Sequence, residues 1–102
     1  DPDLNSIQQA IRDGDYQFSL HAVKRSAERR ISRSEIEEAI LNGEIIERYP
    51  DDKYSPSCLI LGWTTAKRPL HLQLSLAPNV KLITLYEPDA AEWIDYKTRK
   101  TT

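Results

Sequence analysis

The stretch LHLQLSLA, residues 70–77, alternates apolar and polar side chains with a period of two. Leucines occupy every second position, with His71, Gln73 and Ser75 between them. Successive side chains of a strand point to opposite faces of a sheet, so this pattern predicts a strand with one apolar face. We expect the leucine face to pack on helices. The face that carries His71 would then be open, as the floor of a site.

Other segments with the composition of strands flank this one, and turn residues separate them. They are Glu44–Tyr49 and Ser57–Thr64 before it and Lys81–Glu87 after it, with turns at Pro50 and at Pro78-Asn79. Consecutive strands joined by short turns are typical of an antiparallel meander. The sequence therefore predicts a four-stranded antiparallel sheet.

The N-terminal part of the chain has helical periodicity instead. A first short helix is expected around Leu4–Ile11, and an extended link at Tyr16–Phe18 follows it. Ser19 can cap a second helix from about Leu20 to Arg30. Ser32, with Glu35 three residues later, can begin a third helix that stops at Asn42-Gly43. Helices followed by strands indicate an α+β domain with its N-terminal helices packed on the sheet.

Length and composition suit one compact domain over residues 1–102. A last helical turn is expected over Ala90–Tyr96, before a flexible basic tail at residues 97–102. The single cysteine, Cys58, excludes an internal disulfide and a CxxC zinc site, which suits the cytoplasm. No apolar run reaches the roughly 20 residues that span a bilayer, so no membrane partner is expected.

Charge is unevenly distributed along the chain. Residues 17–33 carry five basic side chains and one acidic one, whereas residues 34–54 carry seven acidic and two basic ones. Such asymmetry can mark a local anion site, and two solvated helices would also produce it. The formal net charge of −2 argues against a protein that coats nucleic acid indiscriminately.

A helical wheel separates two stripes on the second helix. The apolar stripe, which we expect in the core, contains Leu20, Val23, Ala27 and Ile31. The polar stripe contains His21, Arg25, Glu28 and Ser32, with Arg29 beside it. Glu28 can hold an arginine in a fixed orientation, and an oriented guanidinium suits bidentate contact with phosphate. An imidazole beside such a guanidinium could serve phosphodiester chemistry, although a solvated helix with an incidental histidine has the same pattern.

The second histidine, His71, strengthens the catalytic interpretation. Two histidines on surfaces that meet would supply a general base for the 2′-hydroxyl of RNA and a general acid for the leaving oxygen. Tyr86, near the end of the next predicted strand, could assist as a hydrogen-bond donor. A histidine flanked by leucines can also be a purely structural, hydrogen-bonded residue, and that alternative stays open.

Four stretches of the sequence together resemble the bacterial domain-of-unknown-function family DUF4258. They are FSLHAVKRSAERRISRSEIEEAILNGEIIERYPDD (18–52), SPSCLILGW (55–63), RPLHLQLSL (68–76) and ITLYEPD (83–89). The resemblance covers about Tyr16 to Trp93. It implies a RelE-like or barnase-like fold and the role of an mRNA-cleaving toxin in a type II toxin–antitoxin pair. The net charge departs from this implication, because such toxins are usually basic.

The family pattern falls on the same positions that the helical wheel and the strand alternation select. They are His21, Arg25, Glu28 and Arg29 on the second helix, His71 on the third strand and Tyr86 on the fourth.

Our leading hypothesis is a metal-independent endoribonuclease that needs no cofactor. His21 and His71 would transfer protons, Arg25 would stabilise charge on the phosphate, Glu28 would orient an arginine, and Tyr86 would donate a hydrogen bond. Lys24, Arg29 and Arg33 would bind the substrate. Expected partners are mRNA, free or on the ribosome, and a cognate antitoxin. The alternative is a non-catalytic module that binds a protein or an anion, and it predicts that the two histidines lie on different surfaces.

Overall fold

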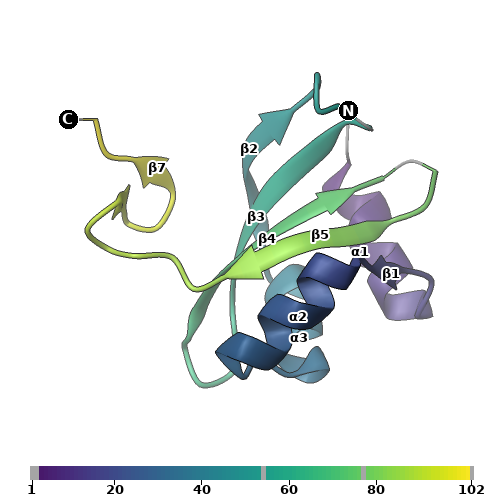
Figure 1. Cartoon of the computed structure of the whole chain (residues 1–102), viewed down its shortest axis with the longest axis horizontal. Coiled ribbons are helices and arrows are strands. Elements are labelled where there is room, and N and C mark those ends of the chain that lie inside the picture. The colour runs from purple at the N-terminus through teal and green to yellow at the C-terminus, as the bar shows by residue number, and fades with distance from the viewer. Residues whose placement is uncertain (1–2, 54, 77, 102) are drawn as a thin grey trace.

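The computed structural model describes residues 3–53, 55–76 and 78–101 (Figure 1). The chain contains three helices and seven strands within these residues. The elements are, in order, α1 (Leu4–Asp13), β1 (Gln17–Phe18), α2 (Leu20–Arg29), α3 (Arg33–Leu41), β2 (Glu44–Tyr49), β3 (Ser57–Trp63), β4 (Pro69–Ser75), β5 (Lys81–Tyr86), β6 (Trp93–Ile94) and β7 (Thr98–Arg99). The α+β class and the four principal strands are as predicted, with boundaries that differ by one or two residues.

The main sheet has five strands in the order β1-β5-β4-β3-β2, not the predicted four. Strands β2 to β5 form the antiparallel meander, and β1 pairs with β5 in parallel. The expectation of a purely antiparallel sheet is therefore wrong. The extra strand is the link before Ser19, where Gln17 N and Ser19 N donate to the carbonyls of Val80 and Leu82. A two-residue strand is too short to show a period, and its partner lies far along the chain.

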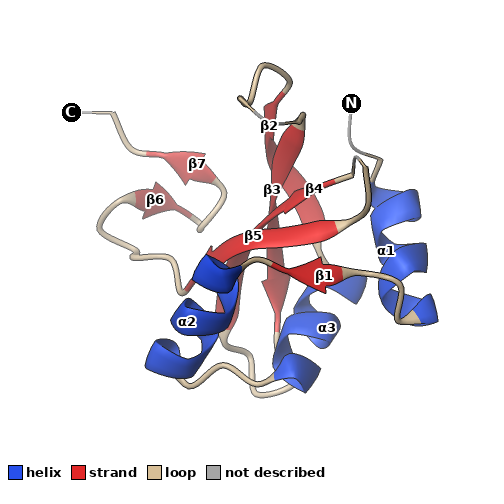
Figure 2. Cartoon of the chain, turned by 45° about the vertical axis from the view of Figure 1, so that its right-hand side comes forward, coloured by secondary structure: helices blue, strands red, loops and turns tan. Residues whose placement is uncertain are grey.

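The helices lie against the main sheet (Figure 2). The leucine face of β4 packs on them, as expected. Leu70, Leu72 and Leu74 are fully buried against a core that includes Ile36 and Ile40 of α3. The opposite face of the sheet, which we call the outer face, carries His71, Gln73 and Ser75. Burial of the branched aliphatic side chains on one face fixes the register of the meander, because a slip of one residue would expose them.

Helix α3 approaches β3 closely at Gly62. A Cβ atom built on Gly62 would lie 1.8 Å from the carbonyl oxygen of Ala39, an impossible contact with backbone. The glycine therefore lets the helix axis come closer to the sheet than any side chain would allow. This contact brings Ala39 and Ile40 onto the sheet, where both are fully buried.

The C-terminal segment forms a hydrogen-bonded turn only at its start, where Trp93 N donates to Asp89 O, and not over the whole of the expected Ala90–Tyr96. Residues 89–100, which we call the strap, contain a turn followed by the β6–β7 hairpin, in which Trp93 pairs with Arg99. Two ion pairs tie the strap to β2: Lys97 Nζ lies 3.0 Å from Glu44 Oε1, and Arg99 Nε lies 2.9 Å from Glu47 Oε2. Residues 97–102 were expected to form a flexible tail. These two contacts attach Lys97 and Arg99 of that segment to the sheet.

None of the helices in the described ranges combines the length and the apolar character that crossing a membrane requires.

Replacing Gly62 by alanine is expected to lower the free energy of unfolding by about 3 kcal/mol or more, because the new methyl group would collide with the backbone of α3. Urea denaturation of the purified protein measures this change. The exposed Ala27→Ser variant, which adds one heavy atom on α2, is the control and should change stability by less than about 0.5 kcal/mol. A Gly62→Ala protein as stable as this control would contradict the close approach.

Candidate active site on helix α2

His71 is fully buried, although its face of the sheet was expected to be open. The strap covers it, with the ring of Trp93 in edge contact at 4.5 Å between centroids. Both ring nitrogens are hydrogen-bonded: Nε2 lies 2.7 Å from the carbonyl oxygen of Tyr96, and Nδ1 lies 3.1 Å from the hydroxyl of Tyr86. A carbonyl can only accept, so Nε2 carries the proton and Nδ1 accepts from Tyr86. Neither nitrogen is available to a substrate in this arrangement.

The surroundings of His71 favour its neutral form. Burial lowers the pKa of His71 below its ordinary value, although the hydrogen bond with Tyr96 acts in the opposite direction. Burial likewise raises the pKa of Tyr86, so its hydroxyl keeps the proton that it donates. Nearby, Glu47 accepts hydrogen bonds from Arg99 and Tyr49, while the guanidinium of Arg99 lies 4.7 Å above the ring of Trp93. These groups form a closed cluster that attaches the strap to the sheet.

Helix α2 begins after Ser19, which makes three hydrogen bonds that fix the start of the helix. The Ser19 backbone N donates to Leu82 O at 2.9 Å, its hydroxyl donates to Ile83 O at 2.6 Å, and the same hydroxyl accepts from Ala22 N at 2.9 Å. Ser19 therefore ends the pairing of β1 with β5 and caps α2 at one point. The helix then packs along β5, and its first turn is fixed to the edge of the sheet.

This attachment rotates α2 away from the predicted orientation. Ala22 is fully buried, whereas Leu20 is 90% exposed and Val23 is 51% exposed. Ala27 is also exposed, so of the predicted apolar stripe only Ile31 lies in the core. The prediction fails because α2 packs against β5, near the edge of the sheet, and a helix in that position buries only one narrow side.

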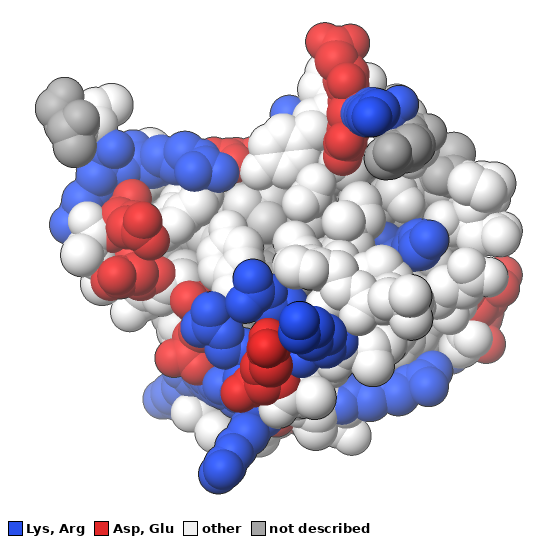
Figure 3. Space-filling model, in the orientation of Figure 1, with Lys and Arg blue, Asp and Glu red and all other residues white. Residues whose placement is uncertain are grey.

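The structure brings together three of the residues on the predicted polar stripe. Arg25 Nε lies 3.5 Å from His21 Nε2, and Arg25 Nη1 lies 3.6 Å from Glu28 Oε1. We call His21, Arg25 and Glu28 the α2 ridge. Figure 3 shows basic and acidic side chains gathered over α2 on one face of the molecule. A carboxylate that holds a partly exposed guanidinium beside an imidazole leaves the remaining N–H donors free to bind an oxyanion.

The other predicted substrate-binding residues divide into two groups. Lys24 and Arg29 are exposed on α2 with the ridge. Arg33 lies on α3, where it pairs with Glu37 at 3.5 Å and lies 5.1 Å above the ring of Tyr16. Arg33 therefore pairs with groups outside the α2 ridge.

The two histidines do not form a common site. His21 is exposed on α2, and His71 lies beneath the strap with both nitrogens occupied. No group of three His, Cys, Asp or Glu side chains suited to a metal ion occurs in the ranges that the structure describes.

Sequence reasoning missed the residue that fixes the far end of α2. The guanidinium of Arg68 donates to the carbonyls of Arg29 at 2.9 Å and Arg30 at 3.3 Å, and it also pairs with Glu35 and Glu87. A cation at a helix C-terminus satisfies its free carbonyls and complements the helix dipole. In the sequence, Arg68 precedes a strand and has no spacing relation to α2, so no local signal could identify this role.

A model of the family described as Domain of unknown function (DUF4258) matches residues 18–87. This region includes the α2 ridge and His71 and ends before the strap. No curated protein and no solved structure matches the chain.

Protonation of His71 is expected to weaken the fold at acidic pH. The buried ring binds a proton less readily than it does in the unfolded chain, whose reference pKa is 6.5. The stabilisation is therefore complete above about pH 6.5 and is lost as the pH falls below that value. Urea denaturation at pH 7.5 and pH 5.5 should show a smaller loss of stability in His71→Gln than in the wild type.

The matched control for this experiment is His21→Gln. The exposed ring of His21 has no buried contacts to lose, so this variant should keep the wild-type pH dependence. An equal decline in stability for wild type and His71→Gln would contradict the assigned role of the buried ring.

Proposed function

Since the chain belongs to the DUF4258 family, we propose that it is a metal-independent endoribonuclease and the toxin of a type II toxin–antitoxin pair. The proposal includes a RelE-like or barnase-like relationship of the fold, mRNA as the substrate, a cognate antitoxin as the partner and the cytoplasm as the location. Support comes from the α2 ridge, where an imidazole, a guanidinium and a carboxylate lie side by side and remain accessible.

The chemistry that this ridge can perform is transesterification within RNA. His21 would accept the proton of a 2′-hydroxyl, the 2′-oxygen would attack the adjacent phosphorus, and the bond to the 5′-oxygen would break. The leaving oxygen would take a proton from solvent or from the imidazolium, which leaves a 2′,3′-cyclic phosphate. Arg25, oriented by Glu28, would stabilise the charge on the phosphoryl oxygens. The nucleophile belongs to the RNA itself, so this reaction needs no metal and no cofactor.

Lys24 and Arg29 extend the positive surface beside the ridge and would contact neighbouring phosphates. We assign His71 and Tyr86 to the attachment of the strap, since the ring of His71 has both nitrogens bonded and no exposed surface. Proton transfer in the proposed reaction thus depends on His21. This differs from a mechanism in which two histidines act as the base and the acid.

A second candidate function is a non-catalytic interaction module, and two observations favour it. His21 is exposed whereas His71 is buried beneath the strap, so the two histidines are apart, as this alternative predicts. Leu20 and Val23 are large apolar side chains exposed on the same helix as the ridge. Apolar residues next to oriented charges are common where proteins bind one another. A toxin would present the same surface to its antitoxin, so only the presence or absence of ridge-dependent RNA cleavage separates the two candidates.

The purified protein should cleave single-stranded RNA in the presence of EDTA. His21→Ala is expected to lower the cleavage rate by about 10²- to 10⁴-fold because general acid–base catalysis is lost. Arg25→Ala should lower it by about 10²- to 10³-fold because charge on the phosphate is no longer stabilised. Gel analysis of a labelled RNA measures both rates.

Arg12→Ala is the matched control, since Arg12 is an exposed cation on α1, away from the ridge. The Arg12→Ala protein should cleave RNA at the wild-type rate. In cells, expression of the wild type should arrest bacterial growth, whereas expression of His21→Ala should not. Equal rates in wild type, His21→Ala and Arg25→Ala would rule out the proposed reaction and leave the interaction module.

A further inference from the structure

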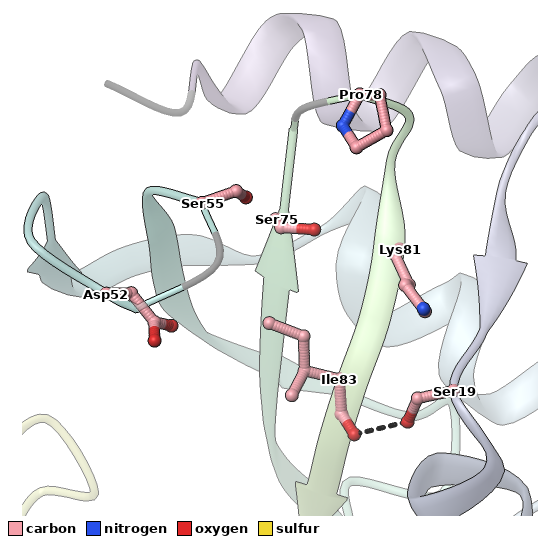
Figure 4. A pocket seen from close by; sticks show the side chains of 7 residues that line it. All are labelled: Ser19, Asp52, Ser55, Ser75, Pro78, Lys81 and Ile83. Atoms are coloured by element: carbon pink, nitrogen blue, oxygen red, sulfur yellow. Dashed lines mark hydrogen bonds between the residues drawn. The ribbon is translucent and has the colours of Figure 1, made fainter.

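A cavity of about 290 Å³ opens on the outer face of the sheet, at the end of β4 opposite His71 (Figure 4). Ser75 at the end of β4, Lys81 and Ile83 of β5, and Asp52 in the loop after β2 line it. Ser19 lines it as well, so the cavity adjoins the first turn of α2, which carries His21. Its volume is near the lower end of the range for ligand sites, which suits one small group.

Two polar side chains of different character line the cavity. Ser75 is 6% exposed, and its hydroxyl can both donate and accept a hydrogen bond. The ammonium of Lys81 is exposed and forms no ion pair with any of the described acidic side chains. A ligand in the cavity can therefore contact a hydroxyl and a cation.

Asp52 is held in a fixed position at the other side of the cavity. Its Oδ2 accepts a hydrogen bond from Ser57 Oγ at 2.6 Å and another from Gln73 Nε2 at 3.4 Å. A carboxylate has about four lone-pair sites, so Asp52 keeps acceptor capacity for a ligand. Figure 4 shows Asp52 and Lys81 on opposite sides, with the apolar side chain of Ile83 between them. The cavity thus offers acceptors at one edge, donors at the other and an apolar surface between.

We propose that this cavity binds a guanine base of the RNA whose phosphate contacts the α2 ridge. Guanine has two adjacent N–H donors, on N1 and N2, and the carboxylate of Asp52 would accept hydrogen bonds from both. Guanine also has two acceptors, O6 and N7, to which Lys81 and Ser75 would donate. None of the other three bases presents this arrangement of donors and acceptors. Adenine lacks the carbonyl oxygen, cytosine has one amino donor beside acceptors, and uracil has a single N–H between two carbonyls. The inference rests on the proposed function because RNA is the ligand class, and it adds the base preference of that site.

Isothermal titration calorimetry with guanosine, adenosine, cytidine and uridine monophosphates tests this inference without requiring catalysis. The wild type should bind guanosine monophosphate most tightly. Asp52→Asn should weaken that binding by about tenfold or more, because an N–H₂ group replaces part of the acceptor. Lys81→Gln should weaken the binding of guanosine monophosphate as well. Because Lys81 is exposed, we expect this variant to fold. Asp51→Asn, an exposed neighbour outside the cavity, is the control and should bind as the wild type does.

Equal affinity for all four nucleotides, or unchanged binding of guanosine monophosphate in both Asp52→Asn and Lys81→Gln, would overturn the inference. The two proposals fail separately. Cleavage that depends on His21 without selective guanosine binding would leave the ribonuclease and exclude the base site. Selective binding that is lost in both variants, in a protein that cleaves no RNA, would establish the nucleotide site and exclude the ribonuclease.

Discussion

The position of the candidate site depends on the hydrogen bonds of one side chain, Ser19. Its hydroxyl donates to Ile83 O and accepts from Ala22 N, while its backbone N completes the pairing with Leu82. The chain changes from strand to helix at this residue, and the direction of α2 is set there. Arg68 fixes the other end of α2 through the carbonyls of Arg29 and Arg30. A helix held at both ends presents its ridge in a defined orientation, as the proposed reaction would require.

The two ends of the outer face of the sheet differ in how far they are exposed. Around His71 the strap closes it, with Trp93 on the ring and the Arg99–Glu47 pair at the margin. Around Ser75 it is open and forms the cavity beside Ser19. The family match ends at residue 87, so the strap belongs to the part of the chain beyond the matched region. Burial of His71 is thus a consequence of contacts with the strap rather than of the sheet alone. The ridge and the cavity are accessible polar surfaces that lie next to each other.

Local patterns were sufficient for much of this architecture. The period of two in residues 70–77 identified the buried leucine face, and Ser19 and Ser32 were correctly recognised as helix caps. The wheel grouped His21 with Arg25 and Glu28, but it could not choose which side of α2 faces the core, because that choice depends on where the helix lies relative to β5. The environment of His71 was beyond local patterns altogether, since Trp93 and Tyr96 reach it from more than 20 residues away in the sequence.

A protein that binds RNA at the α2 ridge and not at the buried His71 should show this in solution. Titration of the ¹⁵N-labelled protein with a 2′-deoxy substrate analogue, which binds but cannot be cleaved, locates the contact by amide chemical-shift changes. We expect the largest changes at Ser19, His21, Arg25 and the residues between them, with the strap amides of Trp93 to Arg99 unaffected. Changes concentrated at the strap and at His71, with α2 unchanged, would contradict it.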